Sequence, residues 1–205
     1  YIMRMDEGKL IHDWNQTDPH FDWQSCKVDL NDETLRDGLQ CPSVRNPEIE
    51  DKRALVHLMV SLGIASADIG LPGAGERAAE DTLALALEVA RNNLPLSMNC
   101  AARTMTADVE PIVRISQQCG IAIEAGAFIG SSPIRLYAED WTLDRLLHAT
   151  DDAVSFAVRE GLPVMFVTED TTRADEETLR ALYTTAINCG ARRLCLADTV
   201  GHATP

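Results

Sequence analysis

The chain has little positive charge, few aromatic side chains and no long apolar segment. Lys and Arg together number 18 against 32 Asp and Glu, so the formal net charge is -14, and aromatic residues make up 5%. A surface with this charge is repelled by nucleic-acid backbones and by anionic membranes. The apolar runs are also much shorter than the ~20 residues that a transmembrane helix requires. We therefore expect a small molecule or another protein as the partner, and neither nucleic acid nor membrane.

Cysteines at metal-binding or redox spacing are also lacking. The 6 cysteines are far apart, with no C-x-x-C motif and no zinc-finger combination with His. No signal peptide precedes them, so reduced thiols in a cytoplasmic protein are the simplest interpretation.

What the chain does have is enough apolar material for one domain with a core, because 45% of its 205 residues are hydrophobic. Residues 1–27 show no sustained periodicity and are predicted to form an N-terminal arm. From residue 28 to residue 205 a short apolar run, a polar turn and a helical pattern alternate. The predicted strands are 28–30, 66–69, 96–100, 121–125, 163–167 and 193–197.

Glycines end the predicted helices directly before the next strand. A glycine in the left-handed backbone conformation at the end of a helix turns the chain back toward a parallel sheet. This arrangement therefore predicts repeated βα units. The four glycines are Gly63, Gly120, Gly161 and Gly190.

Two α/β folds have this local pattern, the (β/α)8 or TIM barrel and the doubly wound sheet. A doubly wound sheet usually carries a glycine-rich phosphate loop after its first strand, whereas Arg36-Asp37-Gly38 contains a single glycine. We therefore predict a TIM barrel. A complete barrel takes about 250 residues, so about six βα units are expected here.

The first helix is predicted from an N-cap at Asn46, a proline at its first position and an apolar face that ends at Gly63. Because Leu58 belongs to that face, we expect it to be buried. The face comprises Leu55, Leu58, Met59 and Leu62.

Polar side chains follow almost every predicted strand. In a barrel these positions converge at one rim, where catalytic residues lie. Each has an ordinary alternative as an ion pair, a helix-capping hydroxyl or an acidic residue at a helix start, but their repetition at successive strands favours a site. The residues are Arg36, Asp37, Gln40, Asn99, Arg103, Ser131, Ser132, Thr168, Glu169, Asp170, Asp198, Thr199 and His202.

Four blocks of sequence resemble the 2-isopropylmalate synthase and homocitrate synthase family, which belongs with 3-hydroxy-3-methylglutaryl-CoA lyase to the metal-dependent TIM-barrel lyases. The resemblance runs from about residue 28 to the end, in the family's order. The blocks are Asp32-Glu-Thr-Leu-Arg-Asp-Gly-Leu-Gln40, Phe128-Ile-Gly-Ser-Ser-Pro133, Glu169-Asp-Thr-Thr-Arg173 and Ala197-Asp-Thr-Val-Gly-His-Ala-Thr-Pro205.

This resemblance implies a role for individual residues. Asp37 matches a carboxylate that binds a divalent metal (Mg, Mn or Zn), and Arg36 matches the arginine that stabilises a developing oxyanion. Glu169 matches an acidic residue close to the metal, and Thr199 a threonine that binds the 2-oxo acid. Further candidates for substrate binding are the strand-end residues Gln40, Arg103 and Ser132.

The chain also departs from the family pattern. The family's His-x-His metal ligands have no counterpart before Pro205 and are expected beyond it. Gly126 and Arg135 occupy positions where 2-isopropylmalate synthases commonly have His, and Leu39 is closer to the lyase pattern.

The leading hypothesis is an acyltransferase that condenses acetyl-CoA with a small 2-oxo acid, as a homodimer. A lyase that cleaves a 3-hydroxyacyl-CoA and a non-catalytic truncated barrel are the alternatives.

Overall fold

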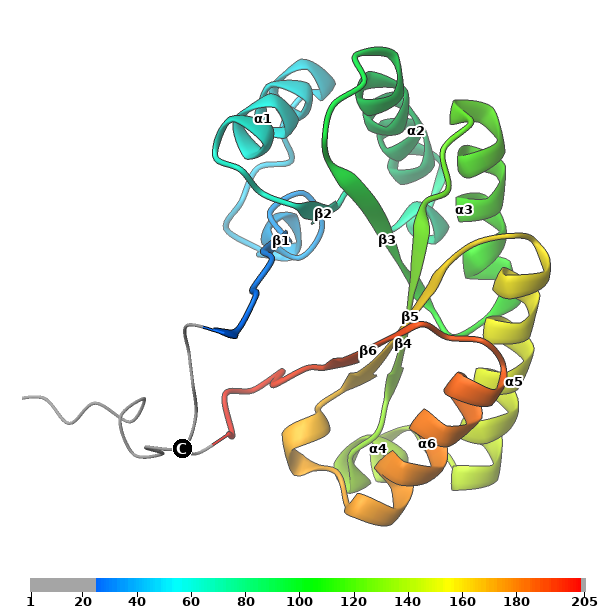
Figure 1. Ribbon diagram of the computed structural model, residues 1–205. Helices are drawn as coiled ribbons and strands as arrows, with labels where there is room; N and C mark the ends of the chain where they lie inside the picture. The colour runs from blue at the N-terminus through cyan, green and yellow to red at the C-terminus, as the bar shows by residue number, and fades with distance from the viewer. Residues whose placement is uncertain (1–24, 204–205) are drawn as a thin grey trace, which may run out of the picture. The chain divides into compact units, whose positions relative to one another are not determined.

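The computed structural model describes residues 25–203, so most of the predicted N-terminal arm lies outside the described residues. Within Asp29–His202, the strands form one parallel sheet in chain order (Figure 1). They are β1 (Asn31–Asp32), β2 (Ser66–Asp68), β3 (Ser97–Arg103), β4 (Glu124–Gly130), β5 (Val164–Glu169) and β6 (Arg193–Leu196). The α-helices are α1 (Ile49–Ser61), α2 (Glu76–Arg91), α3 (Thr106–Cys119), α4 (Pro133–Glu139), α5 (Leu143–Arg159) and α6 (Glu176–Asn188). Short 3-10 turns are η4 (Gly38–Gln40), η5 (Pro72–Ala74) and η6 (Thr171–Arg173).

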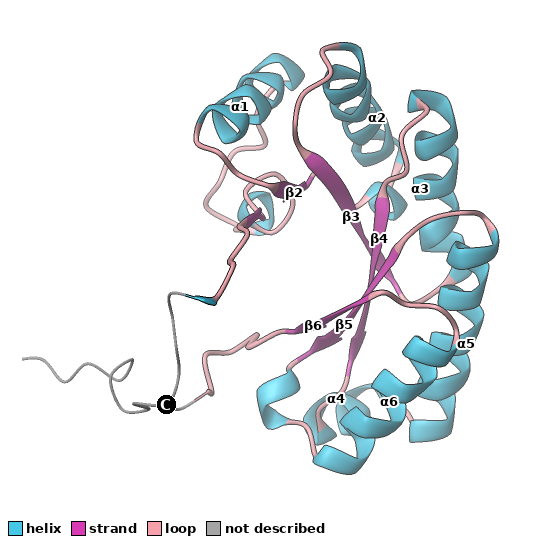
Figure 2. Cartoon of the chain, in the orientation of Figure 1, coloured by secondary structure: helices cyan, strands magenta, loops and turns pink. Residues whose placement is uncertain are grey.

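The order of the strands distinguishes the two folds that the sequence allowed. A doubly wound sheet reverses its strand order at a switch point and carries helices on both faces. Here each strand pairs with the next one along the chain, and the sheet curls with its main helices on one side (Figure 2). The prediction of a partial TIM barrel is confirmed, with six of its strands present.

Strand β5 illustrates how the two faces of the sheet differ. Val164, Phe166 and Thr168 are fully buried, whereas Met165 and Val167 are only partly buried. Because side chains alternate along a strand, the first set faces the helices and the second set faces the inside of the curl. The core therefore lies between sheet and helices, and the inner face is left for the site.

The helix ends agree with the predicted glycines, all four of which have positive φ. The strand limits are less accurate. The first strand is Asn31–Asp32 and not 28–30, and β4 begins at Glu124 and not at residue 121. The chain before β4 is held as a loop, because Ser116 Oγ donates to the carbonyl of Ile121 at 2.7 Å.

Helix α1 differs from its prediction. It begins at Ile49 with Glu48 as N-cap, and its buried face carries Lys52, Val56 and Met59. Of the predicted face, Met59 is buried and Leu55 packs against the core, but Leu58 and Leu62 are 57% and 78% exposed, so the prediction was wrong for these two. Lys52 can be buried because its Nζ lies 2.7 Å from Asp81 Oδ2 on α2.

Two leucine-to-alanine substitutions test this assignment of the core. Leu182 on α6 is fully buried, so Leu182→Ala should lower the free energy of unfolding by about 2–5 kcal/mol. The matched change Leu58→Ala, at an exposed position, should alter it by about 0.5 kcal/mol or less. Urea unfolding followed by circular dichroism measures both, and equal losses would contradict the orientation of α1.

None of the helices in the part of the chain that the structure describes combines the length and apolar character of a membrane span.

Candidate functional site

A cavity of about 650 Å³ lies on the inner face of the sheet, at the carboxyl ends of the strands. We call it the central cavity. Its floor is formed by small or apolar side chains of β3, β4 and β5, among them Ala101, Gly126 and Met165. Six of the predicted strand-end residues line it: Arg36, Asp37, Gln40, Glu169, Asp198 and Thr199.

Arg36 is held at this cavity by three carboxylates. Its Nε donates to Asp68 Oδ2 at 3.1 Å, its Nη1 to Asp37 Oδ1 at 3.0 Å and its Nη2 to Glu33 Oε2 at 2.6 Å. The turn that carries it is closed by the carbonyl of Glu33, which accepts from the N–H groups of Arg36 and Gly38. A guanidinium has five donors, so one remains on each Nη for a ligand.

Asp68, at the end of β2, is the most deeply buried of these carboxylates, with a side chain only 3% exposed. Burial, reinforced by the charge of Glu33, raises its pKa from 3.8 to about 7, and Arg36 opposes this shift. Burial likewise raises the pKa of Glu33. Asp68 therefore exchanges a proton near neutral pH.

Glu169 and Thr199 come from the ends of neighbouring strands. Glu169 ends β5, and its Oε1 lies 3.8 Å from Arg135 Nε on α4. Thr199 follows β6, and its Oγ1 accepts from the backbone N–H of Asp170 at 2.8 Å. The hydroxyl of Thr199 thus ties the two strand ends together and keeps its own proton available for donation.

Arg103 and Ser132 do not line the central cavity. Arg103 makes a two-bond fork with Asp108, Nε to Oδ2 at 2.7 Å and Nη2 to Oδ1 at 2.9 Å, and lines a neighbouring cavity. Ser132 is fully buried at the N-cap of α4. The predicted convergence of all strand-end residues on one cavity is therefore wrong for these two. The other predicted strand-end residues that do not line the central cavity are Asn99, Ser131, Thr168, Asp170 and His202.

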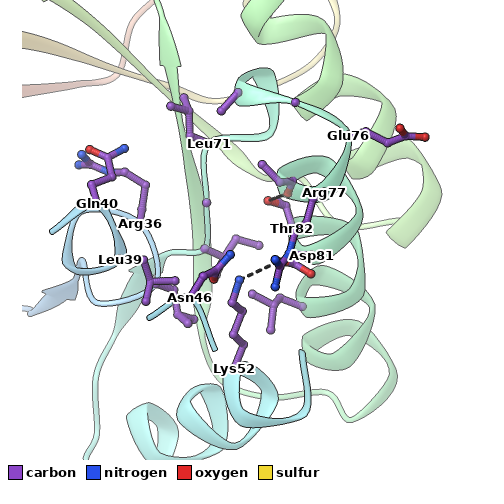
Figure 3. A pocket seen from close by; sticks show the side chains of 17 residues that line it. Arg36, Leu39, Gln40, Asn46, Lys52, Leu71, Glu76, Arg77, Asp81 and Thr82 are labelled. Carbon is purple, nitrogen blue, oxygen red and sulfur yellow. Dashed lines mark hydrogen bonds and ion pairs between the residues drawn. The ribbon is translucent and has the colours of Figure 1, made fainter. Parts of the chain in front are cut away.

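A second cavity of about 470 Å³ lies on the other side of Arg36, between η4, α1 and α2 (Figure 3). Arg36, Gln40 and Leu71 line both cavities. The bond between Lys52 and Asp81 crosses it in Figure 3. A ligand at Arg36 therefore has room to extend in this direction.

The central cavity is acidic. Five carboxylates line it against the single guanidinium of Arg36: Glu33, Asp37, Asp68, Glu169 and Asp198. Such a field favours a cation, and the Asp37 side chain is 67% exposed. Among residues 25–203, however, no three ligating side chains converge in a geometry for a metal ion. These residues alone do not form a complete metal site.

The sequence prediction missed Glu33 and Asp68. Asp68 was placed inside a strand that was expected to run to Ile69, although it is the last residue of β2. The other candidates were selected because each is a polar side chain at the end of a predicted strand. Asp68 would have met the same criterion if the predicted strand had ended at residue 68 and not at residue 69.

Parallel strands in chain order, with charged residues gathered at their carboxyl ends, define an α/β-barrel protein with a rim site. The chain belongs to the HMGL-like family, whose model matches residues 27–205.

Curated relatives agree with this family. A homocitrate synthase, AksA, of Methanopyrus kandleri is 34% identical over 182 residues, which are 87% of this chain and 43% of that protein. A 2-isopropylmalate synthase of Sulfolobus acidocaldarius is 30% identical over 186 residues, 90% of this chain and 46% of that protein. The chain thus spans less than half the length of these relatives.

The fold is also similar to solved structures. HMG-CoA lyase of Bacillus subtilis superposes with a TM-score of 0.65 at 21% identity, over 87% of this chain and 60% of that one. The Pseudomonas aeruginosa enzyme gives a TM-score of 0.66 at 18% identity, with the same coverage. At 21% and 18% sequence identity, these similarities show only that the folds are alike.

Proposed function

We propose that the protein is an acyltransferase that condenses acetyl-CoA with a small 2-oxo acid and then releases CoA by hydrolysis. The observation that carries this proposal is the Arg36 guanidinium, fixed by three carboxylates at a cavity and left with two free donors. The similarity to proteins named 2-isopropylmalate synthase and homocitrate synthase supports it.

In this reaction the acetyl methyl group loses a proton, and the resulting enolate attacks the carbonyl carbon of the 2-oxo acid. Negative charge then develops on the former carbonyl oxygen. Arg36 has a permanent charge and one remaining donor on each Nη, which suit that oxygen. Its attachment to Asp68 and Glu33 means that it is already oriented when charge develops.

Asp68 is the group that we assign to proton transfer. With a pKa of about 7, it accepts the methyl proton when ionised and returns it to the alkoxide formed by condensation. A carboxyl group with its usual pKa would hold a proton far less readily at neutral pH. Water then cleaves the thioester and gives a 2-hydroxy dicarboxylate and CoA.

The remaining predicted residues receive positional roles. Thr199 and Gln40, both at the central cavity, are proposed to bind the 2-oxo acid, whose side chain extends past Arg36 into the second cavity. Glu169 remains a proposed catalytic acid of the same cavity. Ser132 is buried and Arg103 lies outside, so neither is assigned to the 2-oxo acid.

Because of the family resemblance, the proposal includes a divalent metal ion, with Asp37 as one of its ligands. Such an ion would polarise the 2-oxo carbonyl as a Lewis acid. Because the described residues do not complete a ligand set, none of the steps assigned above to Arg36 and Asp68 depends on it. Asp37→Asn should lower the metal content of the purified protein if Asp37 is a ligand.

The test is release of free CoA from acetyl-CoA in the presence of a panel of 2-oxo acids and Mg²⁺, Mn²⁺ or Zn²⁺. We expect one acid to stimulate thiol release well above the rate without acid. Chelation should lower this stimulation, because the ion would polarise the 2-oxo carbonyl. No stimulation by any acid with any metal would contradict the proposal.

A lyase that cleaves a 3-hydroxyacyl-CoA is the second candidate, favoured by Asp68, whose pKa of about 7 also suits removal of a hydroxyl proton. It would form acetyl-CoA from such a thioester without any 2-oxo acid. Inactivity in both assays would favour a non-catalytic barrel. A homodimer and a cytoplasmic location remain predictions.

A further inference from the structure

The loop after β6, which carries Thr199 into the central cavity, is bound by the turn after β5. The backbone N–H of Asp170 in this turn donates to Thr199 Oγ1 at 2.8 Å. The next residue, Thr171, makes two bonds to Ala197: its N–H donates to the Ala197 carbonyl at 3.0 Å, and its Oγ1 accepts from the Ala197 N–H at 3.0 Å. The position of Thr199 therefore depends on where this turn is held.

A series of hydroxyl groups holds the turn from behind. Thr171 Oγ1 donates to the carbonyl of Thr168 at 2.6 Å, and the hydroxyl oxygens of the two threonines are also 2.6 Å apart. The hydroxyl of Tyr183 on α6 lies 2.5 Å from Thr168 Oγ1. Both threonines are buried. We call the hydroxyls of Tyr183, Thr168 and Thr171 the hydroxyl chain, which connects α6 to the turn after β5.

The protons of the hydroxyl chain have one consistent direction. Each hydroxyl has a single proton to donate, and Thr171 gives its proton to the Thr168 carbonyl. Between the two threonines, Thr168 must therefore be the donor, and Tyr183 in turn donates to Thr168. The other acceptor near Tyr183, the carbonyl of Cys195, is more distant at 3.4 Å. A buried polar network whose members all have partners is rigid.

The hydroxyl chain lies outside the central cavity, because Thr168 is on the face of β5 that packs against the helices. We propose that Tyr183, Thr168 and Thr171 are positioning residues, which place the Thr199 hydroxyl at the central cavity so that it donates its proton to a bound ligand. Oγ1 of Thr199 is fixed by the N–H of Asp170, and this N–H belongs to the turn that the chain holds. That the ligand is a 2-oxo acid rests on the proposed function.

Amide hydrogen exchange measured by NMR gives a test that does not depend on turnover. Thr171→Val removes the hydroxyl at nearly constant size, whereas Thr171→Ser keeps it. The N–H groups of Asp170 and Ala197 should exchange about fivefold faster in Thr171→Val than in Thr171→Ser, the effect of losing a hydrogen bond of typical strength. The control Thr184→Val, at an exposed position on α6, should leave both rates unchanged.

Steady-state kinetics of the same variants separate positioning from stability. Thr171→Val should raise KM for the 2-oxo acid about fivefold and leave KM for acetyl-CoA unchanged, because only the contact through Thr199 is lost. Thr171→Ser should restore the acid KM. Tyr183→Phe removes the first hydroxyl of the chain and should raise the acid KM about twofold. A purely structural role would instead lower the amount of folded enzyme without changing either KM.

Equal exchange rates in Thr171→Val and Thr171→Ser would overturn the inference, as would equal acid KM values or parallel increases in both KM values. If Thr171→Val does not fold, Tyr183→Phe decides, and an unchanged acid KM with unchanged exchange of the Asp170 and Ala197 N–H groups would overturn it. Faster exchange of these two groups in Thr171→Val, when no 2-oxo acid stimulates the unsubstituted protein, would support the inference and contradict the proposed function instead.

Discussion

Arg36→Lys should reduce the rate of condensation about 100- to 1000-fold, the usual effect of removing an oxyanion donor. A lysine ammonium retains the charge but has only three donors. It therefore cannot bond to Asp68 and Glu33 and still present two donors to one oxygen. Because the charge beside buried Asp68 is kept, the free energy of unfolding should change by about 1 kcal/mol or less.

The measurement is kcat with saturating acid and acetyl-CoA, alongside urea unfolding of the same samples. Arg114→Lys on α3 is the matched control, since Arg114 is exposed and, among residues 25–203, pairs only with Glu110. This variant should leave both quantities unchanged. A large loss of stability in Arg36→Lys, parallel to the loss of rate, would mean that Arg36 is a structural residue.

Asp68→Asn should lower kcat about 100- to 10,000-fold, the range for loss of a general acid or base. In the unsubstituted protein, the rate should rise with pH through about 7, where Asp68 ionises, because the ionised form accepts the proton. The variant should lack this rise. A pH–rate profile recorded for both proteins measures the difference.

The same residue makes a prediction about stability. The folded-state pKa of Asp68 lies above its usual value of 3.8, so the folded protein binds the extra proton between about pH 4 and pH 7. Its contribution to stability is therefore lost as pH rises through that window, with a slope of up to about 1.4 kcal/mol per pH unit. Asp68→Asn should remove this slope.

Asp152→Asn, at an exposed position on α5, is the control and should keep both the pH–rate profile and the slope. If Asp68→Asn retained the rise in rate near pH 7, Asp68 would not be the group that transfers the proton. Retention of the stability slope alone would assign that slope to another buried acid.

The fold was predictable where local chemistry determines it. Asp175, a residue type that favours helix N-termini, caps α6 by accepting from Thr178 N at 2.8 Å. The glycines at helix ends have the positive φ that the βα pattern requires. The burial of Lys52 on α1 was not predictable, because Lys52 pairs with Asp81, a residue far away in sequence. Hydrophobic spacing alone places Lys52 outside.

The candidate site was predictable in outline for a similar reason. In a parallel sheet all strands end at one edge, so Arg36, Glu169 and Thr199 could be brought together from sequence. The pairing of Arg103 with Asp108 depends on how α3 returns over β3, which residue spacing does not specify. The raised pKa of Asp68 depends on burial and on Glu33, so it required the folded structure.

The most direct test of the account is to identify the product. The protein is incubated with acetyl-CoA labelled with ¹³C in both acetyl carbons, an unlabelled 2-oxo acid and a divalent metal, and the acids formed are analysed by mass spectrometry. The account predicts a 2-hydroxy dicarboxylate that contains the intact acid and both labelled carbons, absent in Arg36→Lys. Labelled acetate with no condensed product would contradict it, because the protein would then only hydrolyse the thioester.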